Sequence, residues 1–286
     1  MICSIYYVGF SNINSLHKND ENPLSTTSTN PLLQKLRIVQ GETVRLPSRG
    51  LLYEDGILDE NVTDGEVRIS PMTIRDEILM RSPDALLSGE AISTVIGRCV
   101  PQILKPLQLH YADLDFIFLA LRKVSYGPEL EVNYKHDCET AKEHSYIVSI
   151  DKKLRDCVYL DPLTIEDQYV LYVEETDQTV IFKPIRTQDM IDILAPQAEK
   201  EMSNAEIEQE MIKLATTQII SVDGVKDRLQ ILEWAAQVPA AVMRNIRQKL
   251  EKMERWGVSY KFGIDCRDCG NHVEAEVPLN TVSFFM

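Results

Sequence analysis

The sequence predicts an α+β fold in which several helices are combined with small antiparallel β-hairpins. Apolar residues recur at helical spacing over residues 111–127 and in three segments between residues 203 and 257. Alternating polar and apolar residues around short turns predict hairpins at 129–150 and 169–185. A last hairpin is predicted around the motif Cys-Arg-Asp-Cys-Gly at 266–270. The fold class follows from these three observations.

The N-terminal half is predicted to contain an arm and an α/β region. Residues 1–31 are expected to form a flexible N-terminal arm, because residues 11–31 are rich in Ser, Thr and Asn. Residues 32–150 are predicted as an α/β region that starts with a β-rich stretch over 35–72. This region is expected to end in a hairpin with Cys138 in its turn.

Three helices are expected within the α/β region. Thr73 and Asp76 have the spacing of a capping box, so one helix is predicted to begin directly after Thr73. A second is expected over 89–100, where a following proline stops it. The third runs over 111–126, with Gly127 as its C-terminal stop. Its apolar face comprises Leu114, Ile117, Phe118, Leu121 and Val124.

The C-terminal half is divided into two predicted regions. Residues 151–195 are predicted as a β-hairpin that turns around Thr176–Gln178, followed by a short helix. Residues 196–286 are predicted as a helical region that ends in the hairpin of the CxxC motif.

Composition limits the classes of function. The chain has 286 residues, of which 44% are hydrophobic, and this is enough for a packed core in one or two domains. It carries 30 Lys and Arg against 44 Asp and Glu, a formal net charge of −14. Phosphate binding needs clustered basic residues, so this charge argues against nucleic acids and anionic membranes as partners. The apolar first ten residues lack a basic start and a cleavage site and are too short to span a bilayer, so we expect folding in a reducing cytoplasm.

The cysteines point to a metal site. The six are Cys3, Cys99, Cys138, Cys157, Cys266 and Cys269, too few for a disulfide framework in a chain of this length. Cys266 and Cys269 are two residues apart and are followed by Gly270 between two strands, which is the knuckle geometry of a zinc ribbon. Cys99 and Cys157 lie in or beside apolar segments and are expected to be buried as small hydrophobic side chains.

A structural zinc site needs four ligands, so a second hairpin is expected to supply the missing ones. The hairpin at 129–150 carries Cys138 in its turn, but the position expected for a partner cysteine is Ala141. His136 and His144 flank this gap, and either could supply an imidazole nitrogen. The sequence therefore predicts a zinc-ribbon-like element formed by two distant hairpins. Its candidate ligands are Cys138, Cys266, Cys269, His136 and His144.

Other interpretations of these residues remain open. A CxxC pair can be redox-active, although thioredoxin-type motifs open a helix and this one bridges two strands. The knuckle could also have lost its metal, with packing alone closing the hairpin. His272 is interpreted as an exposed strand residue and a spare ligand.

No catalytic constellation is evident. P-loop, G-x-S-x-G, H-E-x-x-H and G-x-G-x-x-G motifs are absent from the sequence. The five histidines offer few general bases, and most carboxylates are interpreted as helix caps and solvated faces. We therefore predict a structural or assembly protein and no enzyme.

Four long segments occur in a characteristic order: LPSRGLLYEDG (46–56), GEVRISPMTIRDEILM (65–80), LDFIFLALRKVSYGPELEV (114–132) and WGVSYKFGIDCRDCGNHVEAEVPLNTVSFF (256–285). Together they resemble the T4-type phage baseplate proteins, the hub subunits and hub assembly factors of contractile-tailed phages. The resemblance extends from about residue 44 to the C-terminus and is weakest over 150–240.

The resemblance implies a tail protein that forms or helps to build the central baseplate hub. Such a protein binds other tail and hub proteins, has no chemistry of its own, and works in the host cytoplasm during assembly or in the virion baseplate. A hub around the tail axis would suggest a homo-oligomer with threefold or sixfold contacts. Two alternatives remain: a zinc-ribbon regulatory or interaction module of another role, and an enzyme with an unrecognised site.

The resemblance also bears on the metal site. In that family the first knuckle often has two cysteines, which implies a site of four thiolates. Ala141 departs from this pattern, so only Cys138, Cys266 and Cys269 carry over.

Overall fold

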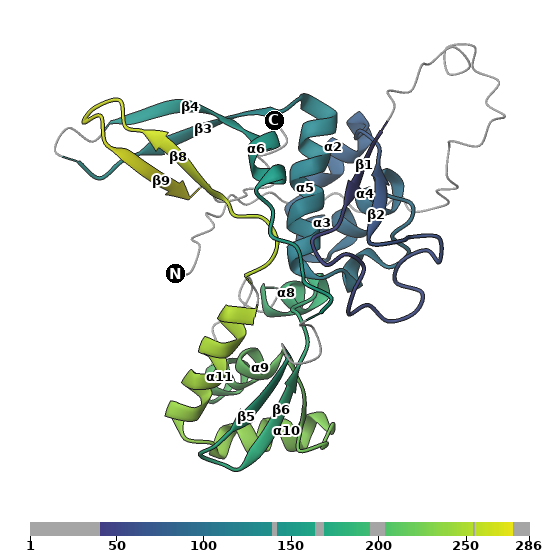
Figure 1. Ribbon diagram of the computed structural model, residues 1–286, viewed down its shortest axis with the longest axis vertical. Coiled ribbons are helices and arrows are strands. Elements are labelled where there is room, and N and C mark those ends of the chain that lie inside the picture. The colour runs from purple at the N-terminus through teal and green to yellow at the C-terminus, as the bar shows by residue number, and fades with distance from the viewer. Residues whose placement is uncertain (1–40, 139–141, 164–168, 195–203, 254, 277–286) are drawn as a thin grey trace. The chain divides into compact units, whose positions relative to one another are not determined.

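The computed structural model describes residues 41–138, 142–163, 169–194, 204–253 and 255–276 (Figure 1). The predicted arm at 1–31 and Cys3 lie outside the described residues, and so does Ala141.

The described residues form helices and small antiparallel sheets, which confirms the predicted fold class. The helices are α2 (Ile74–Met80), α3 (Pro83–Leu87), α4 (Glu90–Cys99), α5 (Tyr111–Tyr126), α6 (Ile150–Arg155), α8 (Thr187–Leu194), α9 (Asn204–Thr216), α10 (Arg228–Gln237) and α11 (Ala240–Met253), with a 3-10 turn η1 at Pro106–Gln108. The strands are β1 (Glu42–Arg45), β2 (Glu66–Ile69), β3 (Glu129–Lys135), β4 (Glu143–Ser149), β5 (Val170–Val173), β6 (Gln178–Phe182), β7 (Ile219–Val222), β8 (Lys261–Asp265) and β9 (His272–Glu276). The sheets are β1–β2, β3–β4, β5–β6–β7 and β8–β9.

Helix α5 is the centre of the first hydrophobic cluster. Its predicted apolar face is buried at Leu114 and Ile117, and its C-terminus falls at Gly127, which has a φ of +100°. Burial extends beyond that face to Phe116 and Leu119, because α6, α8 and β2 all pack against the helix. A helix that is apolar on most sides is a core helix and not a surface helix.

Helix α2 begins at the predicted capping box. The backbone N–H of Thr73 donates to Asp76 Oδ2 at 2.8 Å, and the Thr73 hydroxyl donates to the same oxygen at 2.6 Å. The other Asp76 oxygen accepts from Arg98 Nη1 at 3.1 Å, which ties α2 to α4. The carboxylate is buried, so this cap also joins two helices.

The second hydrophobic cluster consists of the sheet β5–β6–β7 with α10 and α11 packed against it. The predicted hairpin β5–β6 is confirmed, and Gln178 of β6 accepts a hydrogen bond from Trp234 Nε1 at 2.8 Å. Strand β7 was not predicted. Its signal is a β-branched run that ends at a turn, where Asp223 and Gly224 have φ values of +47° and +78°.

The chain enters and leaves this second cluster at one point. Val158 and Gly257 form an isolated antiparallel bridge, with N···O distances of 3.0 and 2.7 Å in the two directions. Gly257 has a φ of +103°, and a Cβ there would lie 3.0 Å from the Ala112 Cβ. The buried residues of the second cluster all lie between these two positions, so that cluster is an excursion from the first.

A buried polar network links the start of α5 to the segment after β1. The Asp113 carboxylate accepts hydrogen bonds from the Ser48 backbone N–H at 2.8 Å, the Ser48 hydroxyl at 2.5 Å and the Tyr53 hydroxyl at 2.6 Å. The Tyr53 oxygen in turn accepts from the backbone N–H of His110 at 2.9 Å. The His110 ring stacks on Tyr53 and its Nε2 lies 3.2 Å from the Leu51 carbonyl oxygen.

Burial shifts the pKa values of Asp113 and His110 in this network, and of Asp115 two residues further along α5, in opposing directions. Burial raises the pKa of Asp113 to about 6 and that of Asp115 to about 7, because water no longer solvates the charged carboxylates. Burial lowers the pKa of His110 to about 3, because it disfavours the charged imidazolium.

We expect the Asp113→Asn variant to be more sensitive to acid than the wild type. Near pH 5 the native state holds a proton on Asp113 that the unfolded state has released, so this group's contribution to stability falls as pH rises from about 4 to 6. His110 has the opposite sign: the unfolded state is protonated there, so its contribution rises with pH from about 3 to 6.5. In Asp113→Asn the contribution of Asp113 is absent, so it no longer offsets the increase in stability with pH that His110 contributes.

The slope of unfolding free energy against pH should therefore become more positive by about 1 kcal/mol per pH unit near pH 5. Urea unfolding of both proteins between pH 4.5 and 6.5 measures this slope. Equal slopes would show that Asp113 titrates at its ordinary pKa in the native state.

Candidate metal centre

Two hairpins from distant parts of the chain bury one face each in the first hydrophobic cluster. Leu130 and Val132 of β3 and Val148 of β4 are buried there, and so are Phe262 and Ile264 of β8. Inward and outward side chains alternate along a strand, so each hairpin packs with a fixed face inward. The sequence predicted both hairpins, and their shared core explains why their turns lie together (Figure 1).

The Cys-Arg-Asp-Cys-Gly turn is closed by its own backbone. The N–H of Cys266 donates to the Asn271 carbonyl at 2.9 Å, and the N–H of Gly270 donates to the Cys266 carbonyl at 2.8 Å. Gly270 has a φ of +73°, a left-handed conformation that glycine adopts at little cost. This turn places Cys266 and Cys269 on the side that faces the other hairpin.

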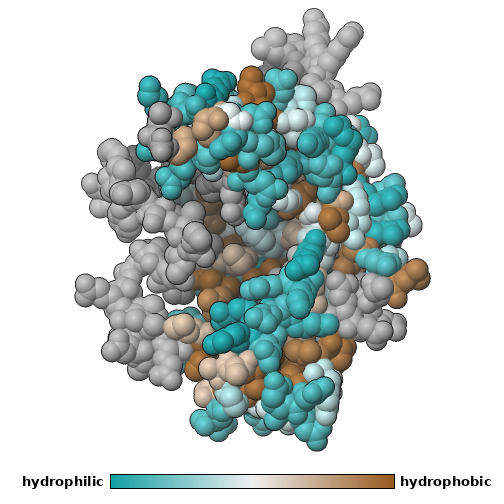
Figure 2. Space-filling model, turned by 60° about the vertical axis from the view of Figure 1, so that its left-hand side comes forward, coloured by the Kyte–Doolittle hydropathy of each residue, from teal (hydrophilic) through white to brown (hydrophobic). Residues whose placement is uncertain are grey.

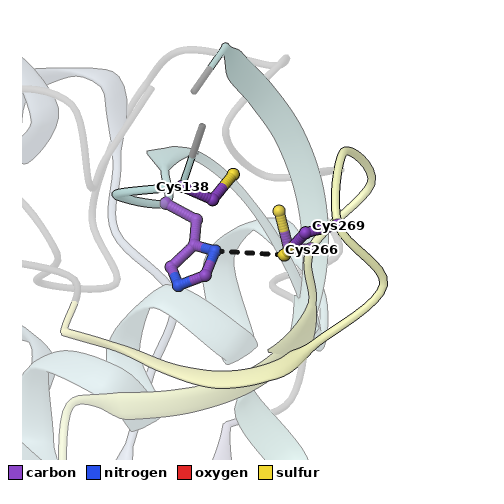
Figure 3. A group of neighbouring side chains, drawn as sticks. Cys138, Cys266 and Cys269 are labelled. Carbon is purple, nitrogen blue, oxygen red and sulfur yellow. Dashed lines mark hydrogen bonds between the residues drawn. The ribbon is translucent and has the colours of Figure 1, made fainter. Parts of the chain in front are cut away.

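Four potential metal ligands meet between the turns. The ligand atoms of His136, Cys138, Cys266 and Cys269 all lie within 4.8 Å of one another. Figure 3 shows the three cysteine sulfurs gathered in one place, and Cys269 Sγ is 3.4 Å from His136 Nδ1. With Zn–S bonds of about 2.3 Å, the sulfurs of a tetrahedral site are about 3.8 Å apart. The distances between the ligand atoms would therefore have to shorten by at most about 1 Å for all four to bind one ion. These residues could hold a metal ion.

The environment of Cys266 favours its metal-binding form. Hydrogen bonds to its sulfur from the backbone N–H of Cys269 and of Asp268, with help from His136, lower the pKa of the Cys266 thiol to about 6. The thiolate is the form that binds metals. Cys99 and Cys157 differ, since burial raises the pKa of each thiol to about 12. Both are buried as predicted, and both lie outside the cluster.

Of the two histidines that the sequence left open, His136 stands with the cysteines. His144 instead lies with Nε2 at 2.9 Å from Asp268 Oδ1. His272, the spare candidate, is exposed and pairs with Asp265 of its own hairpin at 2.8 Å. Metal binding by any of these residues stays a prediction at this point.

The sequence pattern could not have chosen between the two histidines. His136 and His144 both flank the same turn, and the choice depends on which one the distant hairpin approaches. Asp268 was not singled out, although its position between the two cysteines makes it part of any turn that reaches the first hairpin.

The comparison with protein families covers the cluster and most of the chain. A family described as T4 bacteriophage base plate protein matches residues 56–286. The chain belongs to this family. The match includes both hairpins of the cluster, all buried residues of the second hydrophobic cluster and those of the first except Leu46. It confirms the resemblance to the T4-type baseplate proteins. Neither the curated proteins nor the solved structures gave a match.

Membership among the base plate proteins has two direct implications. It suggests a place in the phage tail, and it implies interaction with other tail proteins. In the described part of the chain, no helix is both long and apolar enough to cross a membrane.

Proposed function

We propose that this base plate protein is a component or an assembly factor of the baseplate hub, and that it acts by binding other tail proteins and catalyses no reaction. We further propose that the cluster of His136, Cys138, Cys266 and Cys269 holds a structural zinc ion. The observation that carries the first part is the family match, which spans residues 56–286. The cluster of three sulfurs and one imidazole carries the second.

Exposed apolar side chains support a binding role. Ile74 and Ile78 lie one turn apart on α2 and are 73% and 66% exposed. On the sheet of the second cluster, Val170 and Tyr172 are exposed and Ile181 lies opposite Val170 in the register. Figure 2 shows brown patches that interrupt the hydrophilic surface. Apolar patches of this kind are typical of surfaces that contact other proteins.

A basic helix face adds an electrostatic element to this role. Arg244, Arg247 and Lys252 are exposed on α11 and outnumber the exposed Glu251 on the same face, although the chain as a whole has a net charge of −14. A concentration of one charge sign steers association with a partner surface of opposite charge. Acidic faces of neighbouring tail proteins would suit this helix.

The residues present fit a structural zinc ion. Three thiolates and one imidazole are a common donor set for a closed tetrahedral site. The ion would join the turn of β3–β4 to the turn of β8–β9, which are separated by more than a hundred residues. Because binding requires the folded arrangement, metal affinity adds to folding stability.

The hub role is tested by phage production without this protein. Depleting it during infection should yield incomplete base plates and few infectious particles, and the wild-type gene supplied in trans should restore both. Mass spectrometry of purified mature particles then separates the two forms of the proposal: a component remains in the particle and an assembly factor does not. Normal yields of complete particles without the protein would refute it, in favour of a regulatory or enzymatic role.

Purified protein is expected to contain about one zinc ion per chain. Plasma mass spectrometry measures this content. Cys138→Ala should lose the metal because it removes one of four ligands, whereas Cys99→Ala should keep it, since Cys99 lies outside the cluster. Metal-free wild type prepared with zinc present, or full zinc in Cys138→Ala, would contradict the site.

A further inference from the structure

The two residues between the cysteines of the second turn both contact strand β4. One carboxylate oxygen of Asp268 lies 2.9 Å from His144 Nε2, and the other accepts from the Lys142 backbone N–H at 3.1 Å. The side chains of Asp268 and His144 are only 13% and 24% exposed. Water therefore screens this pair less than it screens a fully exposed ion pair.

Arg267 makes the neighbouring contact. Its backbone N–H donates to the Tyr146 hydroxyl at 3.2 Å, and its guanidinium lies 5.3 Å from the centroid of the Tyr146 ring. His144 and Tyr146 are two residues apart on β4 and so point to the same face of the hairpin. Consecutive residues of the turn thus reach alternate residues of one strand, and none of these contacts involves a metal ligand side chain.

We propose that Asp268 is a positioning residue, which with Arg267 latches the second turn onto β4 and brings Cys266 and Cys269 beside His136 and Cys138 without a metal. The inference rests on the proposed metal site for its consequence, a preformed site. The docking of the two turns is a property of the protein alone.

The latch changes how the metal binds. If the turns were undocked without metal, binding would have to order two segments that are far apart in sequence, and the apparent affinity would fall by the docked fraction. A docked pair presents its four ligands together, so the ordering cost is met by protein contacts. The metal ion then binds to a site whose four ligands are already in position.

The chain offers a matched control for Asp268. Asp265 and His272 form a second Asp–His pair at 2.8 Å in the same C-terminal hairpin. That pair joins β8 to β9 and does not reach the other hairpin, and its side chains are 81% and 69% exposed. Asp265→Asn therefore makes the same chemical change in the same hairpin without touching the latch.

The first experiment uses full-length, metal-free protein in the presence of a chelator. Hydrogen exchange followed by NMR reports on the backbone amides of Lys142 and Arg267, the two donors in the latch. We expect both amides to be protected in the wild type and in Asp265→Asn, and to exchange at least tenfold faster in Asp268→Asn. A double variant that adds His144→Ala to Asp268→Asn should exchange little faster still, because the two residues form one contact.

The second experiment titrates the same proteins with Co²⁺ in competition with a chromophoric chelator. Asp268→Asn should bind Co²⁺ about 10- to 100-fold more weakly, because the carboxylate charge of Asp268 would no longer face the His144 imidazole and the Lys142 backbone N–H. Its absorption bands should keep the shape seen in the wild type, since the four ligands are unchanged. Asp265→Asn should match the wild type in affinity and in spectrum.

The outcomes separate the latch from the metal site. Rapid exchange of both amides in metal-free wild type, or equal exchange in Asp268→Asn, overturns the latch even if Co²⁺ binds tightly. If no protein binds Co²⁺, the proposed metal site fails, and the exchange rates still decide whether Asp268 docks the turns.

Discussion

Asp113→Ala is expected to lower the free energy of unfolding by about 3–6 kcal/mol. The change removes the one acceptor that serves the Ser48 backbone N–H, the Ser48 hydroxyl and the Tyr53 hydroxyl. Asp113 and Ser48 are fully buried, so water cannot replace the lost partner without opening the core. A buried donor without an acceptor costs about 1–3 kcal/mol, and three donors are affected here. The total is expected in the lower part of that combined range, because the two hydroxyl groups can rotate toward other acceptors.

Urea unfolding at pH 7 measures this loss. Asp113→Asn is the control, because its amide oxygen can still accept from Ser48 and its shape fills the same space. We expect the asparagine variant to retain much of the stability that alanine loses. A loss below about 1 kcal/mol in Asp113→Ala would show that the network contributes little to the fold.

Withdrawal of zinc is expected to produce the second large effect. At a free zinc concentration about 1,000 times the dissociation constant, the ion stabilises the native state by about 4 kcal/mol. A strong chelator should remove that stabilisation from the wild type. The chain should still unfold in one cooperative transition, because two hydrophobic clusters and the Asp268 latch remain.

Thermal unfolding with zinc and with chelator measures the difference. Cys266→Ser should unfold at the same temperature in both conditions, since it lacks one of the thiolates that would bind the ion. Cys99→Ala should keep the full zinc response. If the unfolding temperature of the wild type is the same with zinc and with chelator, packing alone holds the two hairpins together.

Local patterns predicted the long elements well. Helix α5 and the hairpins β3–β4, β5–β6 and β8–β9 follow from periodicity and turn residues, and each was placed within a few residues. The short helices α2 and α8 were also predicted, but α3, α6 and β7 were missed because elements of so few residues carry little pattern. Helix α3 had a usable signal, with Ser82 as its N-cap and Pro83 in its first turn.

The candidate site was predictable as a set of residues but not as an arrangement. The spacing of Cys266 and Cys269 indicated a knuckle, and the need for four ligands indicated the hairpin with Cys138. The roles of His136 and His144 depend on how two hairpins approach each other, which no single pattern records. The role of Asp113 could not be predicted for the same reason. Its position is that of an ordinary acidic residue in the first turn of a helix, but the groups that donate hydrogen bonds to it belong to residues 48 and 53, far away in sequence.

The bridge between Val158 and Gly257 has a consequence for how this gene can change. The excursion between them begins and ends at two residues that already touch, so its length is not constrained by any distance it must span. Leu160 hydrogen bonds back to Pro47, Ile185 and Thr187 hydrogen bond back to residues 111 and 109, and α8 packs against α5. Elsewhere the excursion can gain or lose residues without displacing the turns that carry the cysteines. Evolution can therefore remodel the face that this part offers to its neighbours while leaving the rest of the protein in place, much as a domain inserted into a surface loop evolves apart from its host.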